Sequence, residues 1–320
     1  MKVYITSPIP EIGIITLKKA GLEIFVNDKE AATQADLMQA VLDYDAVLTS
    51  VLDKIDEKII KAASPKLKVI ANFAVGWDNI DIMAAQRRGI SVTNTPGVAA
   101  ESVAEHTFAL ILGCFKQLIA ADRYVRGGNF KGWRANLFLS HQVWGKTIGI
   151  VGLGRIGAYV GHIAYGGFKM KILYHDVCRV EDFELLTEAK PASLGKILKE
   201  ADIVTLHVPL TDATRHLIGR EELGMMKKEA ILINTARGAI VDQEALVSAL
   251  REKKIAAAGL DVYEDEHDIP HALRVLGNVI LTPHSASATY ETREAMAKIA
   301  AQNIIDVFEG REPIGLVKVS

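Results

Sequence analysis

The chain has 320 residues, of which 49% are hydrophobic and 24% are charged, and its formal net charge is −2. This length suffices for two domains of ordinary size with a large apolar core. The balanced charge and the absence of any block rich in lysine and arginine argue against a nucleic acid or an anionic membrane as partner. Only Cys114 and Cys178 carry thiols. We expect both to be reduced in a cytoplasmic protein, with neither a disulfide nor a metal site.

Short β-branched runs alternate with helix-favouring stretches through the first hundred residues. The pattern predicts strands at residues 2–6, 23–26, 46–49, 67–72 and 90–94, with helices at 55–63 and 80–89 among them. Strands that alternate with helices imply a parallel sheet covered on both faces. The N-terminal sequence lacks the basic start and long apolar segment of a secretion signal. No stretch offers the roughly 18 uninterrupted apolar residues of a membrane span.

Residues 101–125 are predicted to form one long helix, with Ser102 and Glu105 as a capping box at its start. Its apolar residues run nearly all the way round. A helix that is hydrophobic on every side must be buried on every side. We favour a homodimer that covers this helix, and burial within one chain is the alternative.

A second and more regular series of strands follows this helix. The predicted strands are residues 147–151, 171–175, 202–207, 230–234, 255–260 and 279–282. Six strands with short crossovers match a dinucleotide-binding sheet. The sequence therefore predicts two α/β sheets, one in each part of the chain.

The first strand of the second series runs into a glycine-rich loop and then into a helical stretch, GKTIGIVGLGRIGAYVG (145–161). The first glycine allows a tight turn, the second lets a pyrophosphate approach the backbone, and the third lets helix and strand pack closely. The phosphates would lie at the helix N-terminus. The alternative is a structural turn without a ligand. We predict cofactor contacts from Gly152, Gly154, Arg155, Ile156 and Gly157.

Asp176 ends the next strand, nineteen positions after Gly157. An acid at this spacing accepts hydrogen bonds from both ribose hydroxyls of a dinucleotide, although a coincidental surface aspartate is the alternative. A carboxylate there would repel a 2′-phosphate, so the sequence favours NAD over NADP. Arg179 argues the other way, because a guanidinium nearby can hold that phosphate.

Further candidate residues follow the later strands of the second series. In doubly wound sheets the ligand lies beyond the carboxyl ends of the strands, so these residues converge on one edge. Each has an ordinary explanation alone, as a surface cation or a structural histidine, but their convergence favours a functional site. They are Val208, Pro209, Thr214, Thr235, Ala236, Arg237, the acidic run GLDVYEDEHD (259–268) and His284.

Taken together, the motifs resemble those of the D-isomer-specific 2-hydroxyacid dehydrogenase family. The stretches that carry the resemblance are NFAVGWDNID (72–81), GIVGLGRIG (149–157), INTARGAIVD (233–242), AGLDVYEDE (258–266) and LTPHSAS (281–287). The resemblance implies two doubly wound parallel-sheet α/β domains. A Rossmann NAD domain at 101–285 would be inserted into a flavodoxin-like substrate domain made of 1–100 and 286–320. It also implies homodimers formed through the long helix and the loop after it.

Carried over by position, the family's catalytic arginine, glutamate and histidine fall on Arg237, Glu266 and His284. Asp261 resembles the family's cofactor-contacting aspartate. The resemblance implies hydride transfer between NAD(H) and a 2-oxo or D-2-hydroxy acid, with His284 as acid and base and Arg237 on the substrate carboxylate. Glu266 would orient the imidazole. No metal is required.

The substrate is predicted from the loops of the first domain. Val75 and Gly76 resemble the loop whose N–H groups bind the substrate carboxylate, and Val51 and Leu52 would form a small apolar wall. Residues 72–81 are similar to those of the glyoxylate and hydroxypyruvate reductase branch, which implies a short 2-oxo acid. D-Lactate and pyruvate are the alternative substrates, and an NAD-sensing protein like the family's corepressors is the alternative function.

Overall fold

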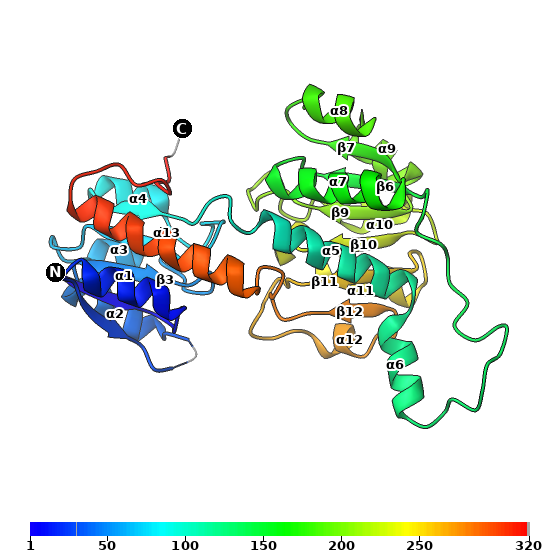
Figure 1. The fold of residues 1–320 in the computed structure, drawn as a ribbon, viewed down its shortest axis with the longest axis horizontal. Coiled ribbons are helices and arrows are strands. Elements are labelled where there is room, and N and C mark those ends of the chain that lie inside the picture. The colour runs from blue at the N-terminus through cyan, green and yellow to red at the C-terminus, as the bar shows by residue number, and fades with distance from the viewer. Residues whose placement is uncertain (30, 319–320) are drawn as a thin grey trace. The chain divides into compact units, whose positions relative to one another are not determined.

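The computed structural model describes residues 1–29 and 31–318. The chain divides into two compact units, Met1–Ala99 with Ala288–Ser320, and Ala100–Ser287. Each unit is built around one parallel sheet (Figure 1). The predicted fold class, two parallel-sheet α/β domains, is confirmed.

Unit 1 contains a five-stranded parallel sheet in the order β2-β1-β3-β4-β5, which is the flavodoxin-like order. Its elements are β1 (Lys2–Ile5), α1 (Glu11–Lys19), β2 (Glu23–Val26), α2 (Gln34–Asp43), β3 (Ala46–Thr49), α3 (Glu57–Ala62), β4 (Val69–Asn72), α4 (Ile82–Arg87), β5 (Ser91–Thr93) and α13 (Tyr290–Phe308). All residues of β3 and β4 are buried, as expected for central strands covered on both faces. The C-terminal helix α13 completes this unit by packing on α1, where a Cβ on Gly13 would come within 3.1 Å of the Ala297 side chain.

Unit 2 contains a seven-stranded parallel sheet in the order β12-β11-β10-β9-β6-β7-β8. Counted from β6, this is the dinucleotide-binding order 3-2-1-4-5-6 with β12 added at the far edge. The elements of its sheet layers are β6 (Thr147–Val151), α7 (Arg155–Phe168), β7 (Lys171–His175), α8 (Glu181–Thr187), β8 (Lys190–Pro191), α9 (Leu194–Glu200), β9 (Ile203–Leu206), α10 (Arg220–Met225), β10 (Ile231–Asn234), η1 (Gly238–Ile240), α11 (Gln243–Arg251), β11 (Ala257–Leu260), α12 (His271–Arg274) and β12 (Val279–Leu281). Among the strands of this sheet, β8 is the one that the sequence did not predict, because a strand of two residues is too short to show an alternating or β-branched pattern.

The predicted long helix is broken. It consists of α5 (Ala100–Phe115) and α6 (Leu118–Arg126), which are bent by 62° at a break where Gln117 adopts a left-handed φ of 51°. Ten residues of α5 are buried and none of α6, so the alternative of burial within one chain holds for α5 and is wrong for α6. The capping box is also wrong, since Ser102 lies inside the first turn of α5.

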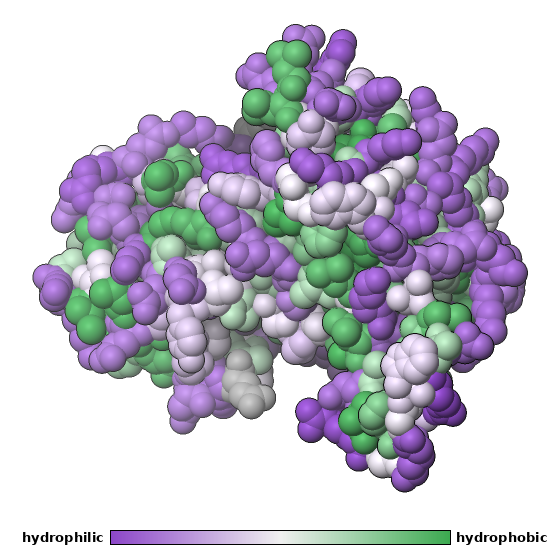
Figure 2. Space-filling view, turned by 45° about the vertical axis from the view of Figure 1, so that its right-hand side comes forward, coloured by the Kyte–Doolittle hydropathy of each residue, from purple (hydrophilic) through white to green (hydrophobic). Residues whose placement is uncertain are grey.

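The surface of α6 is mixed in character. Leu118, Ile119 and Val125 are about half exposed, and hydrophobic residues alternate with hydrophilic ones over α6 and the segment after it (Figure 2). No single helix within the described residues is long and apolar enough to cross a membrane. By length and composition, α5 and α6 meet that criterion only as a pair, across their bend.

Candidate active site

The glycine loop lies where the strand order of unit 2 reverses, between β6 and β9. Gly152 has a φ of +94°, and a Cβ on it would lie 2.7 Å from the carbonyl carbon of His207 at the end of β9. A Cβ on Gly157 would lie 2.2 Å from the carbonyl oxygen of Gly152. By contrast, a Cβ on Gly154 would meet nothing within 4 Å. The first and third glycines therefore permit the fold, while the second leaves open space beside the backbone.

Helix α7 begins at this open space. Gly154 is its N-cap, so no side chain covers the N–H groups of the first turn, which contains Arg155 and Ile156. Free N–H groups and the helix dipole attract an anion. The residues present fit the pyrophosphate of a dinucleotide.

Asp176 follows β7 and contacts the glycine loop. Its Oδ2 accepts a hydrogen bond from the Leu153 N–H at 2.6 Å, and its Oδ1 accepts one from the Cys178 N–H at 3.1 Å. The carboxylate is thus held beside the second strand of the fingerprint, where a dinucleotide presents its adenosine ribose.

Three predicted cofactor residues follow β9. Val208 and Pro209 continue the strand end that packs against Gly152, and Thr214 closes the next turn by donating its hydroxyl to the Pro209 carbonyl at 2.6 Å. Burial lowers the pKa of the neighbouring His207 to about 3, so this imidazole is neutral at working pH.

Arg237 is presented by the turn after β10. The Asn234 side chain shapes this turn, because its Nδ2 donates to the Arg237 carbonyl at 2.8 Å and its Oδ1 accepts from the Ala236 N–H at 3.0 Å. The turn also lies directly against the acidic run, since a Cβ on Gly238 would fall 1.8 Å from the carbonyl carbon of Tyr263. Only glycine fits at this crossing.

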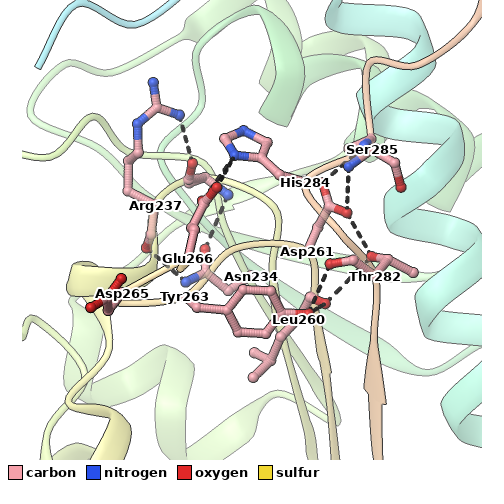
Figure 3. A network of polar contacts seen from close by, with 12 residues as sticks. Asn234, Arg237, Leu260, Asp261, Tyr263, Asp265, Glu266, Thr282, His284 and Ser285 are labelled. Carbon is pink, nitrogen blue, oxygen red and sulfur yellow. Dashed lines mark hydrogen bonds and ion pairs between the residues drawn. The ribbon is translucent and has the colours of Figure 1, made fainter. Parts of the chain in front are cut away.

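His284 and Glu266 form a pair in the same region. Nδ1 of His284 lies 2.9 Å from the Glu266 carboxylate, and the side chains are 27% and 19% exposed. Within the described residues Nε2 makes no hydrogen bond. In Figure 3 the Glu266 carboxylate reaches the imidazole, and the Arg237 guanidinium lies on the same side of the network. A cation, a carboxylate and an open imidazole nitrogen therefore meet at one sheet edge.

Asp261 anchors the turn that carries the imidazole. It is fully buried, and it accepts hydrogen bonds from the Thr282 hydroxyl (2.6 Å), the Ser285 N–H (2.9 Å) and the Ala286 N–H (2.8 Å). Burial alone would raise the pKa of Asp261, but the His106 imidazole, whose Nε2 lies 3.5 Å from Oδ1, and the three hydrogen bonds outweigh it and lower the pKa. The carboxylate is therefore ionised and binds the turn on both of its oxygens.

This anchoring matters because His284 has a left-handed backbone, with φ at 51°. Such a conformation is rare for a residue other than glycine and persists only where the surroundings enforce it. The His284 N–H donates to the carbonyl oxygens of Asp261 (2.9 Å) and Thr282 (3.1 Å). The Tyr263 hydroxyl also donates to the Thr282 carbonyl at 2.8 Å.

The remaining carboxylates of the acidic run point elsewhere. Glu264 is exposed and lies 2.7 Å from Nε2 of His216. Asp265 accepts a hydrogen bond from the His267 N–H at 2.9 Å, and Asp268 is exposed. Only Glu266 contacts the histidine that follows β12.

Helix α5 supports the site from one side. The Thr107 hydroxyl lies 3.1 Å from that of Thr235, and Nε2 of His106 lies 3.0 Å from the Thr282 hydroxyl. These contacts tie α5 to the turns after β10 and β12.

In unit 1 the loop after β4 presents the predicted substrate residues. Nδ2 of Asn72 donates to the Gly76 carbonyl at 2.8 Å, and Nδ2 of Asn94 donates to the Val75 carbonyl at 2.7 Å. Among the described residues, the N–H groups of Val75 and Gly76 make no hydrogen bond. The side-chain amides thus fix the loop and leave two backbone donors for an anion.

The loop after β3 lies beside this one. Nδ2 of Asn79 donates to the carbonyls of Ser50 (3.1 Å) and Asp53 (3.0 Å). These two hydrogen bonds hold the loop on either side of Val51 and Leu52. Leu52 is 45% exposed. Unit 1 therefore places an apolar edge next to two free N–H donors.

Comparisons with known proteins decide the family. The model for the NAD-binding domain of D-isomer specific 2-hydroxyacid dehydrogenases matches residues 108–286, more than half of the chain. A glyoxylate reductase of Korarchaeum cryptofilum is 46% identical over 99% of this chain and 95% of its own. One from Thermococcus litoralis is also 46% identical, over 99% and 96%. The chain belongs to this family.

Two solved structures are similar to this chain over nearly its whole length. The TT0316 protein of Thermus thermophilus has a TM-score of 0.93 and 42% identity, covering 99% of this chain and 100% of its own. The D-lactate dehydrogenase of Aquifex aeolicus, solved with NAD and lactic acid, has a TM-score of 0.86 and 31% identity, covering 97% and 96%. The protein is an NAD-dependent oxidoreductase. In residues 1–29 and 31–318, no group of three or more His, Cys, Asp or Glu is placed to hold a metal ion.

Sequence reasoning missed the residues that position this dehydrogenase's reactive groups. Asn234, Thr282 and His106 are polar side chains at the ends of apolar strands or within an apolar helix. A single sequence marks Asn234 only as a polar residue closing a hydrophobic strand, and it gives no signal for His106. Their function depends on which strand ends lie side by side.

Proposed function

We propose that this dehydrogenase reduces glyoxylate, or a similarly short 2-oxo acid such as hydroxypyruvate, with NADH. The observation that carries the proposal is the His284–Glu266 pair, which leaves one imidazole nitrogen open beside Arg237. The full-length similarity to glyoxylate reductases supports the choice of substrate.

NAD(H), when bound, supplies or accepts the hydride. The open space at Gly154 and the start of α7 would hold its phosphates, and Asp176 its ribose hydroxyls. We propose that the remaining cofactor contacts come from the strand ends, namely Gly152, Arg155, Ile156, Gly157, Val208, Pro209, Thr214, Thr235, Ala236 and Asp261. We also propose that unit 2 is the NAD-binding domain and unit 1 the substrate domain.

His284 would be the acid and base. In the reducing direction the protonated imidazole gives the Nε2 proton to the carbonyl oxygen as that oxygen gains charge, and in the oxidising direction the neutral imidazole takes the hydroxyl proton. Glu266 fixes the tautomer by accepting a hydrogen bond from the Nδ1–H, and its charge stabilises the imidazolium. Arg237 offers paired N–H donors whose geometry matches a carboxylate.

Unit 1 contributes to the choice of substrate in this proposal. The free N–H groups of Val75 and Gly76 would bind a carboxylate, and Val51 with Leu52 would favour a short apolar chain. D-Lactate and pyruvate remain the second candidate pair, because a D-lactate dehydrogenase is among the similar structures.

The test is a panel of 2-oxo acids followed by the absorbance of the reduced nicotinamide. We expect kcat/KM with NADH to be highest for glyoxylate or hydroxypyruvate and lower for pyruvate. A higher value for pyruvate would move the assignment to D-lactate. Tight NADH binding without turnover of any 2-oxo acid would instead favour an NAD-sensing protein.

We further propose a cytoplasmic homodimer that needs neither nucleic acid nor membrane. A hollow of about 1040 Å3 lies between α5, α6, the loop after α6 and the segment before β12, and a second subunit would fill it. The exposed apolar residues of α6 also favour this surface as the dimer interface. A light-scattering mass equal to one chain of 34.8 kDa would reject the dimer.

A further inference from the structure

Arg179, the residue that argues for NADP, is bound by a carboxylate of its own chain. Its Nε donates to Oε1 of Glu184 at 2.9 Å and its Nη2 donates to Oε2 at 2.7 Å. This two-point geometry is the one in which a guanidinium binds a carboxylate or a phosphate most strongly. The edge of the guanidinium formed by Nε and Nη2, which would bind a phosphate at two points, is therefore occupied by Glu184.

Glu184 is itself anchored. It lies in α8, its side chain is 13% exposed, and Oε1 accepts a hydrogen bond from the Tyr174 hydroxyl at 2.6 Å. Tyr174 belongs to β7 and is buried, and its oxygen also accepts from the Val180 N–H at 3.1 Å. The hydrogen bond from Arg179, followed by that from Tyr174, lowers the pKa of Glu184 to about 2. Glu184 is thus ionised and fixed throughout the working pH range.

The pair lies next to the proposed ribose site. Arg179 comes three residues after Asp176, and the Cys178 N–H between them donates to the Asp176 carboxylate. In dinucleotide-binding folds a guanidinium near this acidic position accommodates the 2′-phosphate of NADP. Because Glu184 neutralises Arg179, the charge of Asp176 stays uncompensated.

We propose that Glu184 withholds Arg179 from the 2′-phosphate of NADP and so acts as a second determinant of NAD preference. This inference rests on the proposed cofactor site at the glycine loop and Asp176. Asp176 disfavours the phosphate by repulsion, and Glu184 removes the only guanidinium that follows β7 before α8. Both carboxylates act on the same group of the ligand.

The decisive variant is Glu184→Gln. Its amide oxygen can still accept from Tyr174, but it lacks the charge that holds Arg179. We expect binding of 2′-phospho-ADP-ribose to improve by roughly twofold to fivefold relative to ADP-ribose, the effect of a partly exposed charge pair. Calorimetry of the two ligands measures this ratio, and kcat/KM with NADPH and NADH should change in the same direction.

Two further variants separate the proposal from a general change in charge. Asp182→Asn removes one negative charge from the exposed face of the same helix and should leave the ratio unchanged. Glu184→Gln combined with Arg179→Ala should lose the gain, because the phosphate then has no guanidinium to bind. An equal gain in Asp182→Asn, or a gain that survives removal of Arg179, contradicts the proposal.

The outcomes distinguish this inference from the function on which it rests. If ADP-ribose does not bind the unmodified protein, the proposed cofactor site is wrong. Suppose instead that ADP-ribose binds and that Glu184→Gln has an unchanged melting temperature. If the affinity for 2′-phospho-ADP-ribose relative to ADP-ribose then stays at the value of the unmodified protein, only the role of Glu184 is wrong. The gain should also shrink as salt is raised, since the contact is electrostatic and partly exposed.

Discussion

Replacing Asp261 with asparagine tests whether this carboxylate positions the catalytic turn. An amide presents its oxygen to only one side, whereas Asp261 accepts on both, from Thr282 and Ser285 at Oδ1 and from Ala286 at Oδ2. At least one buried hydrogen bond to a charged acceptor is therefore lost. Such a loss costs about 1.5–3 kcal/mol.

The expected result has a thermal and a kinetic part. For a unit of this size, each kcal/mol lowers the melting temperature by about 2–4 °C, so calorimetry should show a fall of roughly 5 °C. A displacement of about 1 Å at His284 should lower kcat by about 10²-fold. Asp265→Asn is the matched control, because it removes a carboxylate from the exposed part of the same run and should change stability by no more than about 0.5 kcal/mol.

The stability that Asp261 contributes to the fold should fall in acid. Because folding lowers the pKa of Asp261, its contribution is fully present above the ordinary aspartate value of about 3.9 and is lost as pH falls through the lower folded value. The difference in melting temperature between the unmodified protein and Asp261→Asn should thus be constant near neutrality and shrink in acid. An Asp261→Asn protein with unchanged melting temperature and kcat would refute the reasoning.

Two further predictions concern the cofactor loop and the acid that orients the imidazole. Gly154→Ala should leave the melting temperature unchanged, because its Cβ meets no atom, yet weaken NADH binding by about tenfold by occupying the space proposed for the phosphates. Gly157→Ala should instead destabilise the protein by about 1–3 kcal/mol, since its Cβ would overlap the Gly152 carbonyl; equal effects of the two changes on stability would contradict the assigned roles. Glu266→Gln should lower kcat by roughly 10²-fold while NADH binding by fluorescence is retained, and an unchanged kcat would argue against the pair.

The fold was largely predictable because β-branched runs and glycine turns are local signals. The break before α6 was not, since apolar residues continue on both sides of Gln117 and periodicity cannot register a bend there. A single continuous helix also gives no indication that the second half, α6, is exposed within one chain.

The site was predictable in part. Motif positions indicate Arg237, Glu266 and His284, but spacing alone cannot separate Glu264 from Glu266, and only the Nδ1 contact shows which acid meets the imidazole. The hydrogen bonds of Asp261 to the turn after β12 join residues more than twenty positions apart, so no local pattern reveals them.

The central claim is that the imidazole of His284 transfers the proton during reduction. The most direct measurement is a single turnover of glyoxylate by NADH in His284→Ala, with His267→Ala, an exposed neighbouring histidine, as control. We expect the rate to be lower by roughly 10²–10⁴-fold in His284→Ala with NADH binding intact, and to be unchanged in the control. A full rate of NADH oxidation in His284→Ala would contradict it.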